Sequence, residues 1–253
     1  MPAFEPDPGA HVLPPQSPKR WLPCIGLDAP DGTCWTLVEH AAAGDRAARD
    51  EFGRRYLPVV RAYLHARWRG RLSADELEDA VQDVFVAFLS EDGVLEKLNP
   101  GREQAFRPLL YAVVRNMALR VEQARLRKLD TPRTEAFQAE ANPSVEDSLS
   151  RVFDRAWAAA IMREAVDLQE SSARSRGAGA LRRFELLRLT FDERLKMPEI
   201  AARWELESDF LHKELARGKA EFKDALQSVV AFHHPNAPEL VERECRELLT
   251  MLE

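Results

Sequence analysis

The chain has 253 residues, 45% of them hydrophobic and 31% charged, a composition typical of a globular protein with a buried core. The net charge of −6 and the pI near 5.7 argue against a protein that coats nucleic acid indiscriminately, but they are compatible with local basic patches. No apolar run reaches the roughly 18 residues of a membrane span, and no secretory signal pattern occurs, so we expect a cytoplasmic protein without membrane insertion.

The N-terminal part of the chain divides by composition. Residues 1–34 are rich in proline and lack periodicity, so we expect a disordered tail there. Residues 35–128 have helical periodicity and predict a first helical domain. Residues 129–150 lose the apolar period and contain two prolines, which predicts a linker.

The stretch "DELEDAVQDVFVAFL", residues 75–89, predicts a helix with two distinct faces. One face is an apolar stripe that should pack on a core, formed by Leu77, Val81, Val84, Phe85 and Phe88. The opposite face gathers Asp79, Gln82 and Asp83 around Val86. A merely solvated face would carry another polar residue in place of the valine, so this face is a candidate docking surface.

The stretch "FRPLLYAVVRNMALRVEQARLRK", residues 106–128, predicts a second two-faced helix. Its buried stripe should consist of Leu109, Leu110, Val113, Val114, Met117 and Val121. Its other face combines cations, an amide and an aromatic ring, and it carries Arg107, Tyr111, Arg115, Asn116, Arg120, Gln123 and Arg127. These groups can bind phosphates, a base edge and an unstacked base, although a solvated helix face is an equally good interpretation of this stretch alone.

Residues 151–232 predict a second helical domain, and residues 233–253 predict a tail with a short helix. The stretch 197–226 has the outline of a helix-turn-helix, with Ser208 or Asp209 as the cap of its second helix. Phe210, Leu211, Leu215 and Phe222 should point inward, whereas His212, Lys213, Arg217 and Lys219 should face outward toward DNA. A purely structural helical hairpin is the alternative for this stretch.

Signals for catalysis or metal binding are poor. The sequence contains no Gly-rich phosphate loop, no H-E-x-x-H and no G-x-S-x-G, and its three cysteines, Cys24, Cys34 and Cys245, show no metal-binding spacing. Four acids could suggest a metal or acid–base site, namely Glu76, Glu78, Asp79 and Asp83. The sequence contains no second cluster of carboxylates or histidines that would complete such a site. We therefore expect a protein that is not an enzyme and has no catalytic residues, cofactor or metal.

Taken in order, these segments resemble a bacterial RNA polymerase sigma factor of the sigma-70 class, in its extracytoplasmic-function (ECF) form, over about residues 36–232. The most specific part is region 2, with a D-x-x-Q-[DE]-V-F core at 79–85 and an aromatic-x-x-x-R-N-x-A core at 111–118. The resemblance implies an all-α fold of two small domains, a region 2 helical bundle and a region 4 helix-turn-helix, joined by a flexible linker.

The resemblance also implies roles for particular residues. Asp79, Gln82, Asp83 and Val86 would bind the clamp helices of the polymerase β′ subunit. Arg107, Tyr111, Arg115, Asn116 and Arg120 would melt and read the minus-10 element, and a loop at about 91–105 would receive a flipped base. His212, Lys213, Arg217 and Lys219 would lie on the helix that reads the minus-35 element.

The function that the resemblance implies is promoter recognition and transcription initiation. The expected partners are core RNA polymerase, through its β′ clamp helices and β flap, promoter DNA, and an inhibitory protein similar to an anti-sigma factor. The alternative is a sigma-like adaptor or sequestered subunit of a regulatory or defence assembly, with weak promoter activity.

Overall fold

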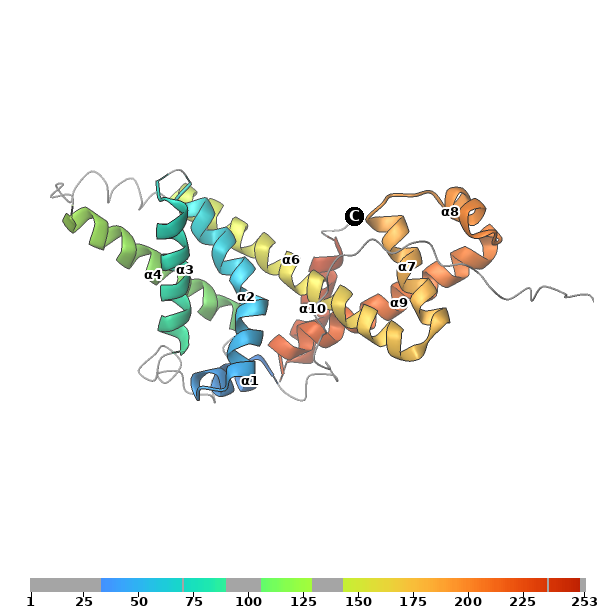
Figure 1. The fold of residues 1–253 in the computed structure, drawn as a ribbon, viewed down its shortest axis with the longest axis horizontal. Helices are drawn as coiled ribbons and strands as arrows, with labels where there is room; N and C mark the ends of the chain where they lie inside the picture. The colour runs from blue at the N-terminus through green and yellow to red at the C-terminus, as the bar shows by residue number, and fades with distance from the viewer. Residues whose placement is uncertain (1–32, 70, 90–105, 129–142, 236, 251–253) are drawn as a thin grey trace, which may run out of the picture.

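The computed structural model describes residues 33–69, 71–89, 106–128, 143–235 and 237–250, and within these residues all regular structure is helical (Figure 1). The expected all-α fold is therefore confirmed. The helices are α1 (Cys34–Ala42), α2 (Arg46–Arg67), α3 (Ala74–Leu89), α4 (Phe106–Lys128), α6 (Pro143–Arg176), α7 (Ala178–Phe191), α8 (Met197–Trp204), α9 (Ser208–His233) and α10 (Pro238–Thr250).

Local sequence signals set the ends of the first helices. Gly44, at φ +94°, separates α1 from α2, because only glycine adopts this backbone conformation without strain. The Asp45 carboxylate then caps α2 by accepting a hydrogen bond from the Ala48 amide at 3.0 Å. Ser73 and Glu76 exchange reciprocal side chain to backbone hydrogen bonds at the start of α3.

Helix α6 starts earlier than we predicted. We placed residues 129–150 in a linker and started the second helical block near Arg151, but α6 already begins at Pro143. Proline suits a first helical turn, and neither glycine nor another proline follows until Gly177. Leu149 is buried on this helix, so tertiary packing stabilises a stretch whose polar composition favoured a linker. Residues 129–142 lie outside the described part of the chain.

One hydrophobic cluster connects the two halves that we expected to be separate domains. It includes buried residues of α1, α2, α3, α4, α6, α9 and α10. At its centre Tyr56 of α2 stacks on Trp157 of α6 with ring centroids 6.0 Å apart, and Trp157 contacts the ring of His233 of α9 at 4.9 Å. Helix α10, expected as part of a tail, buries Cys245 and Leu248 in the same cluster. Figure 1 shows α6 running from the α1–α4 group toward α7 and α9.

A smaller cluster holds α7, α8 and α9 together, around Leu186, Leu189, Ile200 and Leu211. The turn between α8 and α9 passes through Glu205, whose φ of +55° is left-handed. This is the turn position at which glycine is common, so the glutamate adopts the required conformation at some cost in free energy.

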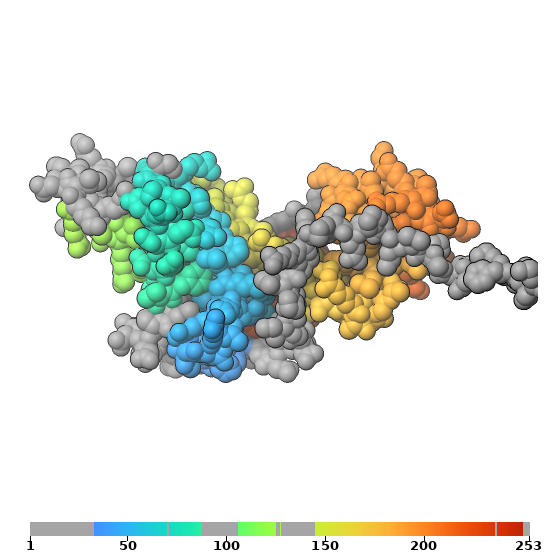
Figure 2. Space-filling model, in the orientation of Figure 1, coloured from blue at the N-terminus to red at the C-terminus, as the bar shows by residue number. Residues whose placement is uncertain are grey.

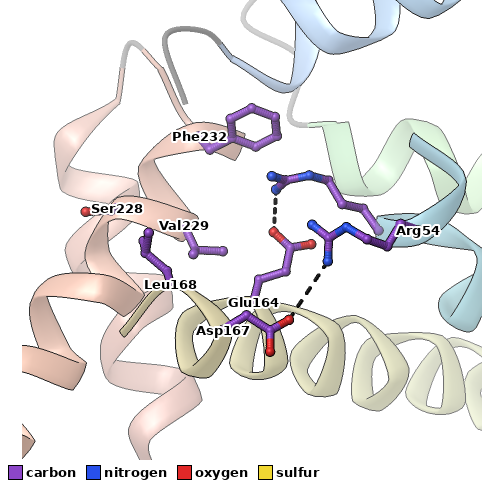
Figure 3. A pocket seen from close by; sticks show the side chains of 8 residues that line it. Arg54, Glu164, Asp167, Leu168, Ser228, Val229 and Phe232 are labelled. Atoms are coloured by element: carbon purple, nitrogen blue, oxygen red, sulfur yellow. Dashed lines mark hydrogen bonds and ion pairs between the residues drawn. The ribbon is translucent and has the colours of Figure 1, made fainter. Parts of the chain in front are cut away.

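A buried ion pair lies where α2, α6 and α9 meet (Figure 3). Arg55 of α2 donates to Glu164 of α6 and also to Glu51 of α2 at 2.5 Å, and its guanidinium lies 4.5 Å from the ring centroid of Phe232. Burial raises the pKa of Glu164, an effect that Arg55 and Arg54 oppose. The adjoining cavity of about 30 Å³ has room for a water molecule or two but not for a metabolite, so this cluster is structural.

Candidate functional site

The apolar face of α3 is buried as the sequence predicts. Leu77, Val81 and Val84 are buried and Phe85 is partly buried, while the side chain of Phe88 lies outside the described residues. This packing fixes the rotation of α3 and turns its other face to solvent. Figure 2 shows α3, in teal, at the surface of the molecule.

Four of the acids of α3, those considered above as a possible metal or acid–base site, separate into two pairs with different environments. The Glu76 carboxylate accepts a hydrogen bond from the Ser73 amide at the start of the helix, and Glu78 forms an ion pair with Arg61 of α2 at 2.5 Å. Asp79 and Asp83 instead remain exposed. Within the described ranges no group of three or more His, Cys, Asp or Glu side chains could hold a metal ion.

The exposed face of α3 is the predicted docking surface, which consists of Asp79, Gln82, Asp83 and Val86. The three polar side chains are exposed, and Val86 is 65% exposed, more than any other large hydrophobic residue that the structure describes. An exposed valine flanked by an amide and carboxylates offers an apolar contact with hydrogen-bond acceptors around it. These are features of a protein–protein contact.

The apolar stripe of α4 is also buried. Leu110, Val113 and Val114 are at most 4% exposed, and Leu109, Met117 and Val121 pack partly buried against the same cluster. The predicted nucleic-acid face is therefore the opposite side of a firmly held helix. Its neighbouring loop, expected at about 91–105, lies outside the described residues.

The residues of the predicted minus-10 face lie in two different environments. Asn116 and Arg120 are exposed. Arg107 forms an ion pair with Asp154 of α6, and Arg115 donates to Glu146 of α6 at 3.0 Å. The other two contacts at this face are aromatic: the ring of Tyr111 packs edge-on against Tyr63 at 5.7 Å and against Phe153 of α6 at 5.2 Å.

The carboxylate of Glu146 joins three helices. It accepts from Arg67 of α2 at 2.9 Å as well as from Arg115 of α4. Burial alone would raise the pKa of Glu146, but the hydrogen bonds from the two arginines outweigh it and hold this pKa below its ordinary value. The hydrogen bond to Glu146 likewise raises the pKa of Arg115. Both groups are thus charged at neutral pH.

The predicted minus-35 residues share the outer side of α9. His212, Lys213, Arg217 and Lys219 are all exposed. Arg217 also pairs with Glu214 at 2.8 Å, and the Lys219 ammonium lies 5.3 Å from the ring centroid of Phe191.

Two expectations for α9 were wrong. Its N-cap is Glu207, without a side-chain cap hydrogen bond, and Ser208 is already the first helical residue. Phe210, expected to point inward, is 40% exposed. The inward face instead follows Leu211, Glu214 and Gly218, a register that places position 210 toward solvent.

Two residues at the predicted nucleic-acid face were missed by sequence reasoning, Glu146 and Asp154 of α6. The expected linker ended just beyond the first of them. The periodic signal was present nevertheless, because Leu149, Phe153 and Trp157 recur every fourth residue and are all buried. This spacing could have located α6, but not its ionic partners on other helices.

Comparison with known families bears on α2, α3 and α4. Residues 53–130 match the family model of Sigma-70 region 2. The matched segment includes most of α2 and all of α3 and α4, and it ends before α6. No curated protein matches the chain. This segment is therefore similar to region 2 of the sigma-70 factors.

None of the described helices combines the length and apolar character that crossing a bilayer demands.

Proposed function

We propose that this chain is a sigma factor of the sigma-70 class and ECF type, which binds core RNA polymerase in the cytoplasm and directs it to promoters. The observation that carries the proposal is the Sigma-70 region 2 match over residues 53–130. In this proposal residues 35–128 act as region 2, and residues 151–232 act as region 4 with a helix-turn-helix. The chain itself binds and positions, and catalysis belongs to the polymerase.

In the proposed complex the docking surface of α3 contacts the clamp helices of the β′ subunit. Val86 supplies the apolar centre of the contact, and Gln82 can both donate and accept hydrogen bonds at its edge. The carboxylates of Asp79 and Asp83 favour a partner surface that carries cations. The support for this role is the 65% exposure of Val86 between exposed polar neighbours.

The proposed DNA contacts come from α4 and α9. On α4, Asn116 hydrogen-bonds an unpaired base and Arg120 contacts phosphate, so that these contacts offset the free energy of unstacking. On α9, Lys213, Arg217 and Lys219 contact phosphates and His212 contacts a base edge in the major groove. The net charge of −6 limits binding of the chain alone to DNA, so polymerase binding precedes promoter binding.

The polymerase contact can be tested by co-purification of tagged chain with core RNA polymerase. We expect Val86→Asp and Gln82→Ala to lower the affinity for polymerase, the former by at least tenfold, because a carboxylate would be buried in the contact without a partner. Circular dichroism should remain that of the wild type, since position 86 is exposed. The matched control is Val166→Asp on α6, where the valine is 41% exposed and belongs to a different helix.

The promoter contact is tested by run-off transcription on genomic fragments with the reconstituted holoenzyme. Asn116→Ala should leave polymerase affinity unchanged and impair promoter opening. Failure of the wild-type chain to bind polymerase would refute the proposed function. Equal transcription by Val86→Asp, Gln82→Ala, Asn116→Ala and the wild type would refute the assigned residues.

An adaptor or sequestered subunit, inhibited by a protein similar to an anti-sigma factor, is the second candidate. The observation that favours it is the pairing of Arg107 and Arg115 with α6, which leaves less of the α4 face open to DNA. Polymerase binding without run-off product would support this candidate over the first.

A further inference from the structure

The nucleic-acid face of α4 is partly covered by another segment of the same chain. This segment is residues 146–154 of α6, hereafter the cover segment. Its two end residues, Glu146 and Asp154, are the carboxylates that pair with Arg115 and Arg107. The two arginines flank Tyr111 on α4, so the cover segment contacts the centre of the predicted minus-10 face.

The cover segment also occupies the aromatic part of this face. Phe153 is 1% exposed, and its ring lies 5.2 Å from that of Tyr111 at an interplanar angle of 69°. A tyrosine that receives an unstacked base needs an accessible ring face. In this structure its neighbouring space is filled by Phe153 and Tyr63.

Each group on the cover segment has a counterpart in single-stranded nucleic acid. The two carboxylates take the place of phosphates beside the arginines, and the phenyl ring takes the place of a base beside Tyr111. One side chain could pair with a cation by chance. Two acids and an aromatic ring that together satisfy two cations and an aromatic ring form a matched set.

We propose that the cover segment competes with single-stranded DNA for the α4 face, so that the free chain is autoinhibited. The inference rests on the proposed function, because it assigns DNA binding to that face. The closed arrangement is the resting state, since displacing the segment would expose Leu149 and Phe153, both members of the main core. Farther along α6, the buried Arg55–Glu164 pair holds the helix on α2, so displacement need only involve its N-terminal turns.

The test compares the affinity of polymerase-free chains for a fluorescein-labelled, random-sequence, single-stranded DNA pool, measured by anisotropy. Glu146→Gln/Asp154→Asn keeps the side-chain shapes and removes the two charges that compete with phosphate. We expect this double variant to bind about tenfold more tightly than the wild type. Adding Asn116→Ala to it should reverse most of the gain, which locates the bound DNA on α4.

The matched control is Asp147→Asn/Glu170→Gln, which also removes two negative charges from α6. Asp147 is exposed, and Glu170 pairs within α6 with Arg174. The control should bind DNA no more than about twofold more tightly than the wild type. An equal gain in control and test variants would mean a general charge effect and would overturn the proposal, as would no gain in the test variant.

A second measurement uses the unaltered chain. Hydrogen exchange of residues 146–154 should become faster when the same DNA pool is present at saturating concentration, while exchange around Glu164 stays slow. Unchanged exchange in the cover segment with DNA bound would overturn the competition. These results are independent of polymerase, so a failure of the proposed function appears separately, as absent co-purification and absent run-off product.

Discussion

At the scale of single residues, the close approach of α7 and α9 depends on Gly218. A Cβ at this position would lie 3.1 Å from the Arg183 carbonyl oxygen and 3.2 Å from the Leu187 side chain. The amide of Gln169 donates to the Gly218 carbonyl at 3.0 Å, which further fixes the backbone. Gly218 of α9 thus has a packing role.

Gly218→Ala should therefore lower the free energy of unfolding by about 1 kcal/mol, because overpacking against α7 exceeds the gain in helix propensity. The control is Gly53→Ala in α2, where the new Cβ would have nothing within 4 Å. That change should instead stabilise the chain by about 0.5–1 kcal/mol. Urea unfolding measures both, and stabilisation by Gly218→Ala would contradict the packing role.

His233 is a second residue whose environment decides its chemistry. Its Nδ1 lies 3.0 Å from the Val229 carbonyl, which can only accept, so Nδ1 donates and Nε2 accepts from the Tyr56 hydroxyl at 3.1 Å. Burial lowers the pKa of His233 to about 4, outweighing the hydrogen bond to Val229, and nearby Arg55 lowers it further. The imidazole is thus neutral in the folded chain.

This environment predicts an acid sensitivity. Between pH 6.5 and pH 4 the unfolded chain binds a proton at His233 that the folded chain excludes, so the free energy of unfolding falls as the pH falls. The slope from this residue reaches at most about 1.4 kcal/mol per pH unit. In His233→Gln the pH dependence of the free energy of unfolding should be flatter in this window. The His234–Glu244 pair is present in both the variant and the wild type, so the difference between their slopes reports on His233. Identical slopes in urea unfolding from pH 4 to 7 would refute the assignment.

At the scale of elements, the packing of α6 on α2 depends on the Arg55–Glu164 pair, whose side chains are 7% and 8% exposed. Glu164→Gln would leave the guanidinium with Glu51 as its remaining carboxylate, and removing one partner of a buried pair costs about 3 kcal/mol. Urea unfolding should detect this loss. Glu170→Gln on the same helix, in a largely exposed pair with Arg174, should change stability by less than about 0.5 kcal/mol. Equal effects of the two changes would contradict the structural role of the pair.

The elements also differ in how well the sequence predicted them. The stripes of α3 and α4 were predicted because local periodicity alone decides which side of a helix is apolar. The start of α6 was missed because the polar composition of residues 129–150 hid the spacing of its buried residues, and the outward turn of Phe210 was missed because it depends on how α9 packs in the folded chain. The same limit explains why the α4 cations were predicted as a DNA face while their partners, Glu146 and Asp154, were missed.

At the scale of the whole molecule, the sequence predicted two helical units but not the core that connects them. Polar composition between residues 129 and 150 favoured a flexible connection, and the stacking of Trp157 on Tyr56 could not be deduced from either segment alone. The proposed polymerase-binding, minus-10 and minus-35 residues lie on α3, α4 and α9, as expected, and their roles remain predictions that the experiments above address.

The length of α6 has a further consequence for this arrangement. It is a single helix of 34 residues, about 50 Å long at 1.5 Å per residue, that contacts both α2 and α9. Each residue of a helix also advances about 100° around its axis. Insertion or deletion of one residue in the middle of α6 would therefore twist the α9 side of the molecule relative to the α4 side. The number of residues in α6 thus fixes the rotation of α9 relative to α4, the two helices proposed to read DNA. The number of base pairs between two promoter elements fixes their relative rotation around the DNA axis in the same way.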